Sequence, residues 1–181
     1  MVLRFAYTRP DGGTSIVAAA PKDELAIAIG KRDPETGAPV LSDEEYRKHV
    51  IERSIPKDAT NIIELPRDWV APDSDRTFRD AWTLDGGSMK VDMPKAREVM
   101  KNMMRFARKA HMEKLDGEYM RADELKNEAQ KAAIAAKKQA LRDVTESPSI
   151  AAAASPDELR AAWPTDVLGE NNRFKSKKKR T

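Results

Sequence analysis

The chain has 181 residues, enough for one ordinary domain or for a small domain with a helical extension. Charged residues make up 35% of it and aromatic residues only 6%, so we expect a thin core that relies partly on a partner or on self-association. There is no cysteine, which excludes disulfides and thiolate metal sites and fits a reducing compartment.

The net charge of +3 is unevenly distributed along the chain. Six of the 33 basic residues lie in positions 171–181, where no acid occurs, which leaves the rest of the chain with 27 basic against 30 acidic residues. The first residues lack the apolar run of a signal peptide, and no window reaches the roughly 18 apolar residues of a membrane span. We therefore expect a protein made in a cytoplasm, without a membrane partner.

The N-terminal part predicts a small α+β unit. Residues 3–7 and 15–19 have the pattern of short strands, and the Pro-Asp-Gly-Gly turn at 10–13 predicts a hairpin between them. Residues 22–29 predict a short helix that ends at Gly30. After a loop over 31–39, Ser42 and Glu45 form a capping box for a helix that runs to about Ser54 and stops before a proline.

A second hairpin is predicted further along this unit. Residues 61–65 predict a strand and residues 69–77 an irregular segment. Residues 78–84 and 88–91 predict the two strands of the hairpin on either side of an Asp-Gly-Gly turn at 85–87. The unit is expected to span 1–91. Its predicted core consists of Phe5, Tyr7, Ile16, Tyr46, Val50, Ile63, Leu65, Phe78 and Trp82.

The second half of the chain is predicted to be helical over 92–164. Asp92 is a suitable N-cap, and Pro94 falls in the first turn, where its missing N–H is tolerated. Apolar residues then recur at spacings of three and four, which predicts one continuous buried face. They are Ala96, Val99, Met100, Met103, Phe106, Ala107, Ala110, Leu115, Tyr119, Ala122, Leu125, Ala129, Ala132, Ala133, Ala136, Ala140, Leu141 and Val144.

This stretch allows a single helix of about 50 residues or an antiparallel helical hairpin that turns at 123–127. We favour the hairpin, because it buries the alanine-rich face of its second helix against the Met/Phe face of the first. Pro148 stops the helix. A second capping box at 155–158 predicts a short helix with Leu159 and Trp163, ended by Pro164, and residues 165–181 are expected to form a flexible basic tail.

No motif indicates catalysis or a cofactor. The two histidines, His49 and His111, fall inside predicted helices without ligand-type spacing, and the Gly-Gly pairs are turn residues rather than phosphate-binding loops. The carboxylates of Asp73, Asp75 and Asp80 are explained by loop solvation and turn formation. We therefore expect no enzyme, no metal and no cofactor.

Two regions are candidates for binding. Methionines are dense along the first long helix, where they suit either a hairpin core or an adaptable partner surface. The basic tail is predicted to be a solvated terminus or a segment that binds nucleic acid or an acidic protein surface. Its basic residues are Arg173, Lys175, Lys177, Lys178, Lys179 and Arg180.

The helical half resembles a known family. The run Lys-Gln-Ala-Leu-Arg-Asp-Val at 138–144, followed by Pro148 and by Trp163-Pro164, resembles the C-terminal segment of tailed-bacteriophage tail-fibre assembly proteins. Residues 76–100 are similar to small proteins encoded in phage tail regions, so the resemblance covers about 76–164. Gly117-Glu118-Tyr119 stands where that family has a tryptophan, and the basic tail is extra.

The resemblance implies a non-enzymatic virion protein of the tail or fibre region, made in the host cytoplasm. Its partner would be another virion protein, bound transiently by an assembly chaperone or permanently by a structural component; nucleic-acid binding through the tail is the alternative. An apolar contact is expected from Met100, Met103, Phe106, Leu115 and Trp163. Arg97, Arg105, Arg108 and Arg142 are expected to set register and partner choice.

Overall fold

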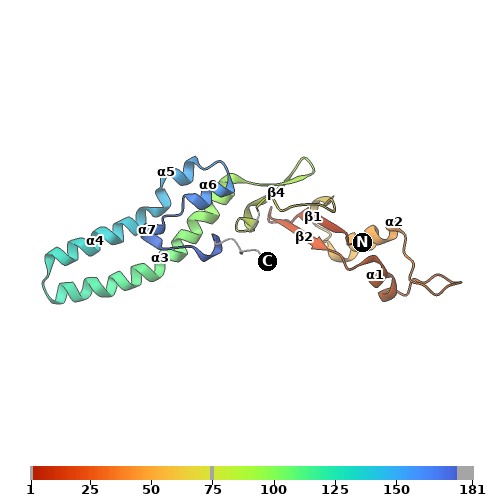
Figure 1. The fold of residues 1–181 in the computed structure, drawn as a ribbon, viewed down its shortest axis with the longest axis horizontal. Coiled ribbons are helices and arrows are strands. Elements are labelled where there is room, and N and C mark those ends of the chain that lie inside the picture. Colours follow the sequence, from red (N-terminus) through yellow and green to blue (C-terminus); the bar gives the residue numbers. More distant parts are fainter. Residues whose placement is uncertain (1, 74–75, 175–181) are drawn as a thin grey trace, which may run out of the picture. The chain divides into compact units, whose positions relative to one another are not determined.

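The structure is a computed structural model that describes residues 2–73 and 76–174. The fold is α+β, as predicted: short strands and two helices dominate the N-terminal part, and helices the rest (Figure 1). The chain divides into two compact units, Met1–Pro72 with Trp82–Lys90, and Asp73–Ala81 with Val91–Thr181. We call them the N-terminal unit and the helical unit.

The N-terminal unit is built on a three-stranded antiparallel sheet of order β2-β1-β3. Strands β1 (Arg4–Thr8) and β2 (Thr14–Ala18) form the predicted hairpin, and Gly12 adopts the positive φ of 76° that its turn requires. Strand β3 (Thr60–Glu64) pairs with the other edge of β1. The central strand therefore buries its Phe-Ala-Tyr segment, whereas the predicted core residues Ile16 and Ile63 lie on edge strands and are only half-buried.

Two helices cover this sheet. Helix α1 (Lys22–Ala28) ends before Gly30, and α2 (Asp43–Ser54) begins with the predicted capping box, in which Ser42 Oγ accepts the Glu45 N–H at 3.1 Å. The apolar face of α2 buries Tyr46 and Val50, and the Tyr46 hydroxyl donates to the Ala20 carbonyl. The core of the unit comprises Leu3, Phe5, Tyr7, Ala26, Leu41, Tyr46, Val50 and Ile55.

The second predicted hairpin is present as β4 (Trp82–Asp85) and β5 (Ser88–Val91). Trp82 is buried, its ring lies edge-on to Trp69 with centroids 6.2 Å apart, and its carbonyl accepts the Thr14 hydroxyl at 2.9 Å. The residues before β4 differ from the prediction. Phe78 was expected in this core, but it precedes the 3₁₀ turn η1 (Arg79–Ala81) and is buried in the helical unit.

The helical unit is organised around an antiparallel pair, α3 (Met93–Glu124) and α4 (Glu128–Asp143) (Figure 1). The predicted hairpin is therefore confirmed, and the single long helix is excluded. The chain reverses through Leu125 to Asn127, where Lys126 has a left-handed φ of 53° and Asn127 Oδ1 caps α4 by accepting the Gln130 N–H at 3.0 Å.

Short helices complete this unit. The 3₁₀ turn η2 (Val144–Glu146) follows α4 and leads into α5 (Pro148–Ala152), so the long helix ends before Pro148, and Pro148 is the first residue of the next helix. Helix α6 (Pro156–Ala161) begins at the predicted cap Ser155 and buries Leu159. These elements and the next helix pack against α3, whereas the far part of the α3–α4 pair extends beyond them as two helices alone (Figure 1).

The segment after Pro164 departs from the predicted flexible tail. Helix α7 (Thr165–Leu168) and the 3₁₀ turn η3 (Asn172–Phe174) are formed there, and Leu168 is buried. The Phe174 ring lies edge-on to Trp163 at 5.6 Å, which provides the packing that the local sequence pattern does not reveal. The predicted tail residues Lys175, Lys177, Lys178, Lys179 and Arg180 lie outside the described residues.

Candidate partner-binding surface

The two helices of the hairpin meet along a stripe of α4 that alternates lysine with aliphatic residues. Lys131, Ile134, Lys138 and Leu141 recur at spacings of three and four, which places them on one face of the helix. Ile134 and Leu141 are buried, and the two lysine side chains are only 19% and 18% exposed. The α3-facing side of α4 is thus made of two aliphatic side chains and two lysine stems.

Both lysine amines are held by groups of α3. Lys131 Nζ lies 2.6 Å from Asp123 Oδ1, and Lys138 Nζ lies 2.5 Å from Asp116 Oδ1. The Tyr119 ring lies beneath both amines, with Nζ-to-centroid distances of 5.8 and 5.5 Å. The hydrogen bond that Lys131 donates to Asp123, followed by the one that it donates to Glu128, raises the pKa of Lys131 above its ordinary value, so this contact stays charged at neutral pH.

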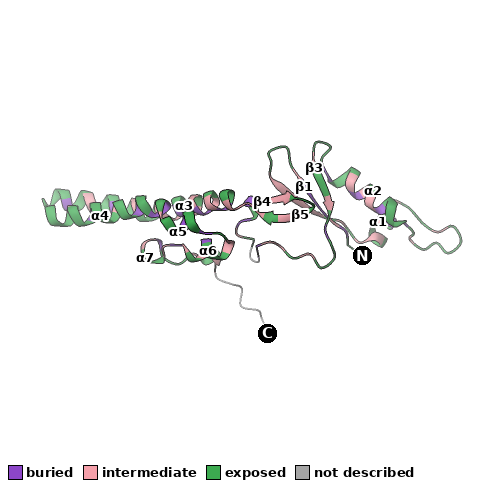
Figure 2. Ribbon diagram, turned by 90° about the horizontal axis from the view of Figure 1, so that it is seen from above, coloured by how far each residue is buried: buried purple, intermediate pink, exposed green. Residues whose placement is uncertain are grey.

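This arrangement corrects the predicted alanine interface. The alanines expected against α3 are exposed instead, and most of α4 is coloured as exposed in Figure 2. We call this surface the alanine face; it consists of Ala129, Ala132, Ala133, Ala136 and Ala140. The physical reason is reach: a lysine stem covers more apolar surface than an alanine methyl and can also place its amine on a carboxylate.

Three of the five predicted apolar contact residues are part of the core. Met100 is fully buried, Leu115 is 9% exposed, and Trp163 is 8% exposed. The Trp163 indole Nε1–H donates to the Gly169 carbonyl at 2.8 Å. These side chains hold the helical unit together and present almost no surface to a partner.

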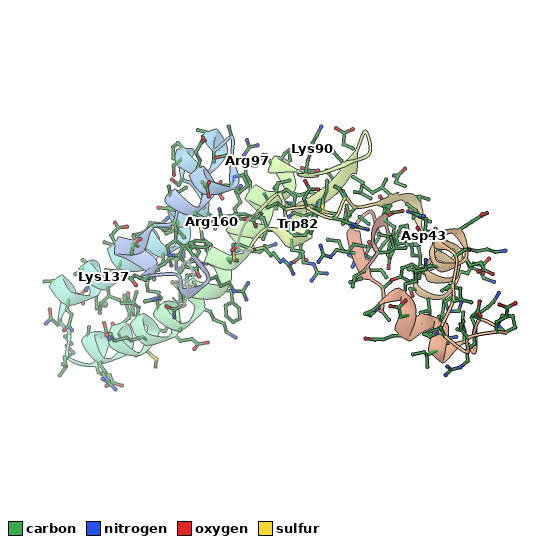
Figure 3. All side chains as sticks on the ribbon, turned by 45° about the vertical axis from the view of Figure 1, so that its right-hand side comes forward. Asp43, Trp82, Lys90, Arg97, Lys137 and Arg160 are labelled. Carbon is green, nitrogen blue, oxygen red and sulfur yellow. The ribbon has the colours of Figure 1, made fainter. Side chains whose placement is uncertain are left out.

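Two of the four predicted arginines also serve the fold. Arg97, labelled in Figure 3, donates through Nη2 to the Ala153 carbonyl at 2.9 Å. Arg108 Nη1 lies 3.3 and 3.2 Å from the carbonyls of Leu141 and Arg142, so it satisfies acceptors at the end of α4. These side chains tie α3 to the segments that return along it.

The other two arginines are exposed. Arg105 Nη1 donates to Asn102 Oδ1 at 2.6 Å, and Arg142 Nη1 donates to Gln139 Oε1 at 3.3 Å. Both contacts lie within one helix, and both side chains remain at the surface. Of the predicted set of arginines, these two are available to set the register of a partner.

The side of α3 away from α4 carries two large apolar side chains that remain exposed. Phe106 is 83% exposed and Met120 is 65% exposed, and their spacing of 14 positions makes almost four full turns, or about 21 Å. Ala110 and Gly117 are exposed at intermediate positions on the same face. We call these four residues the outer stripe. Leu125, 75% exposed, follows at the hairpin turn.

Sequence reasoning selected Phe106 but missed Met120 and assigned Leu125 to the buried face. The 14-residue spacing of Phe106 and Met120 is the signal that could have identified the stripe, because residues four turns apart share a face. The remaining predicted contact, Met103, is half-buried, and its Sδ lies 4.0 Å from Arg173 Nη1. Arg173 is exposed and is the only one of the six basic tail residues that lies within the described part of the chain.

A cavity of about 360 Å³ opens between α3, α4 and α7. Leu115, Leu141 and Val167 contribute apolar walls, and Lys137, labelled in Figure 3, lies at its α4 side. A volume of this size can receive one large side chain of another protein. The cavity therefore adds a recess to a surface that otherwise consists of convex helix faces.

The described residues contain no group of three or more His, Asp or Glu side chains that could hold a metal ion. Within 2–73 and 76–174, no helix is both long and apolar enough to cross a membrane. Comparisons with protein-family models, with curated proteins and with solved structures found no match to this chain.

Proposed function

We propose that this chain is a non-enzymatic tail- or fibre-region protein of a tailed bacteriophage, and that it binds another virion protein through its helical hairpin. The observation that carries the proposal is the outer stripe together with Leu125, where three large apolar side chains are more than 60% exposed on one helix and its turn. Large apolar side chains left exposed along a helix are typical of protein-interaction surfaces.

The architecture of the hairpin supports this role. Beyond the short helices, α3 and α4 pack only on each other, so both keep a face that no described element covers. The outer stripe offers large side chains, and the alanine face offers a smooth surface on which a partner helix can approach closely. The hairpin also falls within residues 76–164, the segment that resembles tail-fibre assembly proteins.

A co-purification experiment tests the surface. We expect Phe106→Asp and Met120→Asp each to reduce capture of the virion partner from infected cells by at least tenfold, because each places a charge on a desolvated contact. Lys48→Asp is the control, since it introduces the same side chain at an exposed position of helix α2, outside both the stripe and the cavity between α3, α4 and α7. Undiminished capture by both stripe variants, with normal helicity, would contradict the proposal.

Mass spectrometry of purified virions separates the two forms of this function. A structural component is present at a fixed copy number relative to the other tail proteins. An assembly chaperone is present in infected cells and absent from finished particles. The Phe106→Asp phage should in either case assemble fewer complete tails.

The alternative function, nucleic-acid binding, rests on the six basic residues at 171–181 and on the exposure of Arg173. Removing residues 173–181 should abolish DNA binding that weakens with salt, because each neutralised phosphate releases counterions. Replacing the same lysines and arginines by glutamine keeps the chain length and removes the charge, and it should abolish this DNA binding as well. An unchanged gel shift of the truncated chain at low salt would end this alternative.

A further inference from the structure

A cavity of about 490 Å³ lies in the N-terminal unit, between α1, α2 and the segment that follows β2. Its walls are mostly small or aliphatic, and its polar groups come from one helix, α2. The lining residues are Ala19, Ala20, Leu25, Ala28, Ile29, His49, Val50, Arg53 and Ser54. This volume and this mixture, an apolar interior with few polar groups, are typical of sites for small ligands.

The charge of the lining has one sign. Arg53 lines the cavity, and no acidic residue does so among its described lining residues. Arg53 is exposed and has no ion-pair or hydrogen-bond partner within 2–73 and 76–174, in contrast to Arg47 six positions earlier on the same helix, which pairs with Glu64 at 2.7 Å. A guanidinium at an apolar cavity favours a carboxylate, which it can bind through two parallel hydrogen bonds.

His49 provides a second, independent indication. Its ring lines the cavity, and its Nε2 is buried without a hydrogen-bond partner among the described residues. A buried polar atom left unpaired costs about 1–3 kcal/mol, so it needs an explanation such as a ligand or an ordered water. The Cβ–Cγ torsion of histidine is broad, so a small rotation of the ring brings Nε2 to a group inside the cavity.

We propose that this cavity binds a small monocarboxylate with a compact branched or aromatic apolar body. The apolar body contacts Leu25, Ile29 and Val50, the carboxylate pairs with Arg53, and His49 Nε2 hydrogen-bonds to the ligand. The same chemistry occurs in a free carboxylic acid and in the C-terminal residue of another protein chain. This site lies in the N-terminal unit, and its existence does not depend on the function proposed for the hairpin.

Nuclear magnetic resonance titration of the full chain tests the site, with N-acetyl-leucine as the probe and N-acetyl-leucinamide as the uncharged control. We expect N-acetyl-leucine to shift the methyl signals of Leu25, Ile29 and Val50, and the amide to bind at least fivefold more weakly. Equal binding of acid and amide, or shifts confined to other residues, would overturn the proposal.

Substitutions assign the parts of the site. Arg53→Ala should weaken N-acetyl-leucine at least fivefold, whereas Lys48→Ala, a control on the exposed side of the same helix, should leave the affinity unchanged. Ala28→Phe, at an exposed position of the lining, should fill the cavity and abolish binding. Wild-type affinity in Arg53→Ala shows that the arginine only stabilises the end of α2 and contradicts the proposal.

His49→Phe keeps the bulk of the ring and removes its nitrogens. Weaker binding supports the assigned hydrogen bond, and unchanged binding refutes that part of the site. The source of the ligand follows from two further probes, 4-methylpentanoate and a hexapeptide ending in leucine. Tighter binding of the peptide identifies a chain terminus, and tighter binding of the free acid identifies a small molecule.

Discussion

Asp73 and Arg160 form a buried ion pair although 87 residues separate them in the chain. The Asp73 side chain is fully buried and the Arg160 side chain is 14% exposed. Asp73 Oδ2 also accepts the Phe78 N–H at 2.7 Å, and the guanidinium carbon of Arg160 lies 5.5 Å from the centre of the Phe78 ring. This contact attaches the segment before β4 to α6 within the helical unit.

Replacing Asp73 by alanine should destabilise the helical unit by about 3–5 kcal/mol, because it removes the fully buried carboxylate that faces the mostly buried Arg160 guanidinium. The Phe78 N–H also loses its acceptor. Urea unfolding followed by circular dichroism measures the difference. Asp157→Ala is the control, because it removes a second carboxylate that pairs with Arg160. The Asp157 side chain is 92% exposed, so its loss should lower the stability by less than about 1 kcal/mol. Similar stabilities of the two variants would argue against a structural role for the buried pair.

Substitution by alanine should destabilise the protein strongly at Met100 and hardly at all at Phe106. Met100 is fully buried, so Met100→Ala should cost about 2–5 kcal/mol through lost contacts and a cavity. Phe106 is 83% exposed, and Phe106→Ala should change stability by less than about 0.5 kcal/mol. Chemical denaturation of both variants provides the comparison. A large loss of stability in Phe106→Ala would show that the outer stripe belongs to the core.

The hairpin turn contains a strained residue. Lys126 has a φ of 53°, a conformation that costs an L-residue about 1–2 kcal/mol and glycine almost nothing. After allowance for the greater freedom of glycine in the unfolded chain, Lys126→Gly should stabilise the hairpin by about 0.5–1 kcal/mol. Thermal unfolding tests this, with Lys126→Ala as the control that removes the charge and keeps the strain. Equal melting temperatures for the two variants would contradict it.

The capping box of α2 should make the N-terminal unit sensitive to acid. The hydrogen bond from Lys31, followed by those from Ser42, lowers the pKa of Glu45 from its ordinary value of 4.5 to about 2. Because the folded-state pKa is the lower one, this stabilisation is complete above about pH 4.5 and disappears as the pH falls towards about 2. Glu45→Gln should therefore unfold at a lower temperature than the wild type at pH 6, and the two unfolding temperatures should converge near pH 2. The amide signal of Tyr46, followed by nuclear magnetic resonance, reports the unfolding of this unit. A difference independent of pH would argue against this origin.

Local signals in the sequence predicted the boundaries of most elements correctly. Ser42, Asp92 and Ser155 each cap a helix through a side-chain oxygen, and Gly12 supplies its turn. These features depend on interactions between residues that are close in the sequence, so they can be predicted without knowledge of the fold. The position of the helical reversal follows from the same kind of signal.

The choice of buried faces could not be predicted in the same way. On α4, the alanines and the lysine stripe both have helical periodicity, and hydropathy alone favours the alanines as the face that packs against α3. The lysines face α3 because Asp116, Asp123 and Tyr119 of α3 bind their amines. Similarly, α7 and η3 are ordered beside Trp163, whose partner Phe174 lies 11 positions further along the chain.

The sequence by itself thus determined the α+β class and the caps, turns and prolines that delimit the elements, because these depend on backbone chemistry between near neighbours, and it favoured the helical hairpin over one long helix. Only the tertiary structure decided that Phe78 packs with the helices and that Met100, Leu115 and Trp163 are core. It also decided that Phe106, Met120 and Leu125 are exposed. Burial depends on which distant side chains pack against a position and pair with it, and the pattern of residues along the sequence does not contain that information.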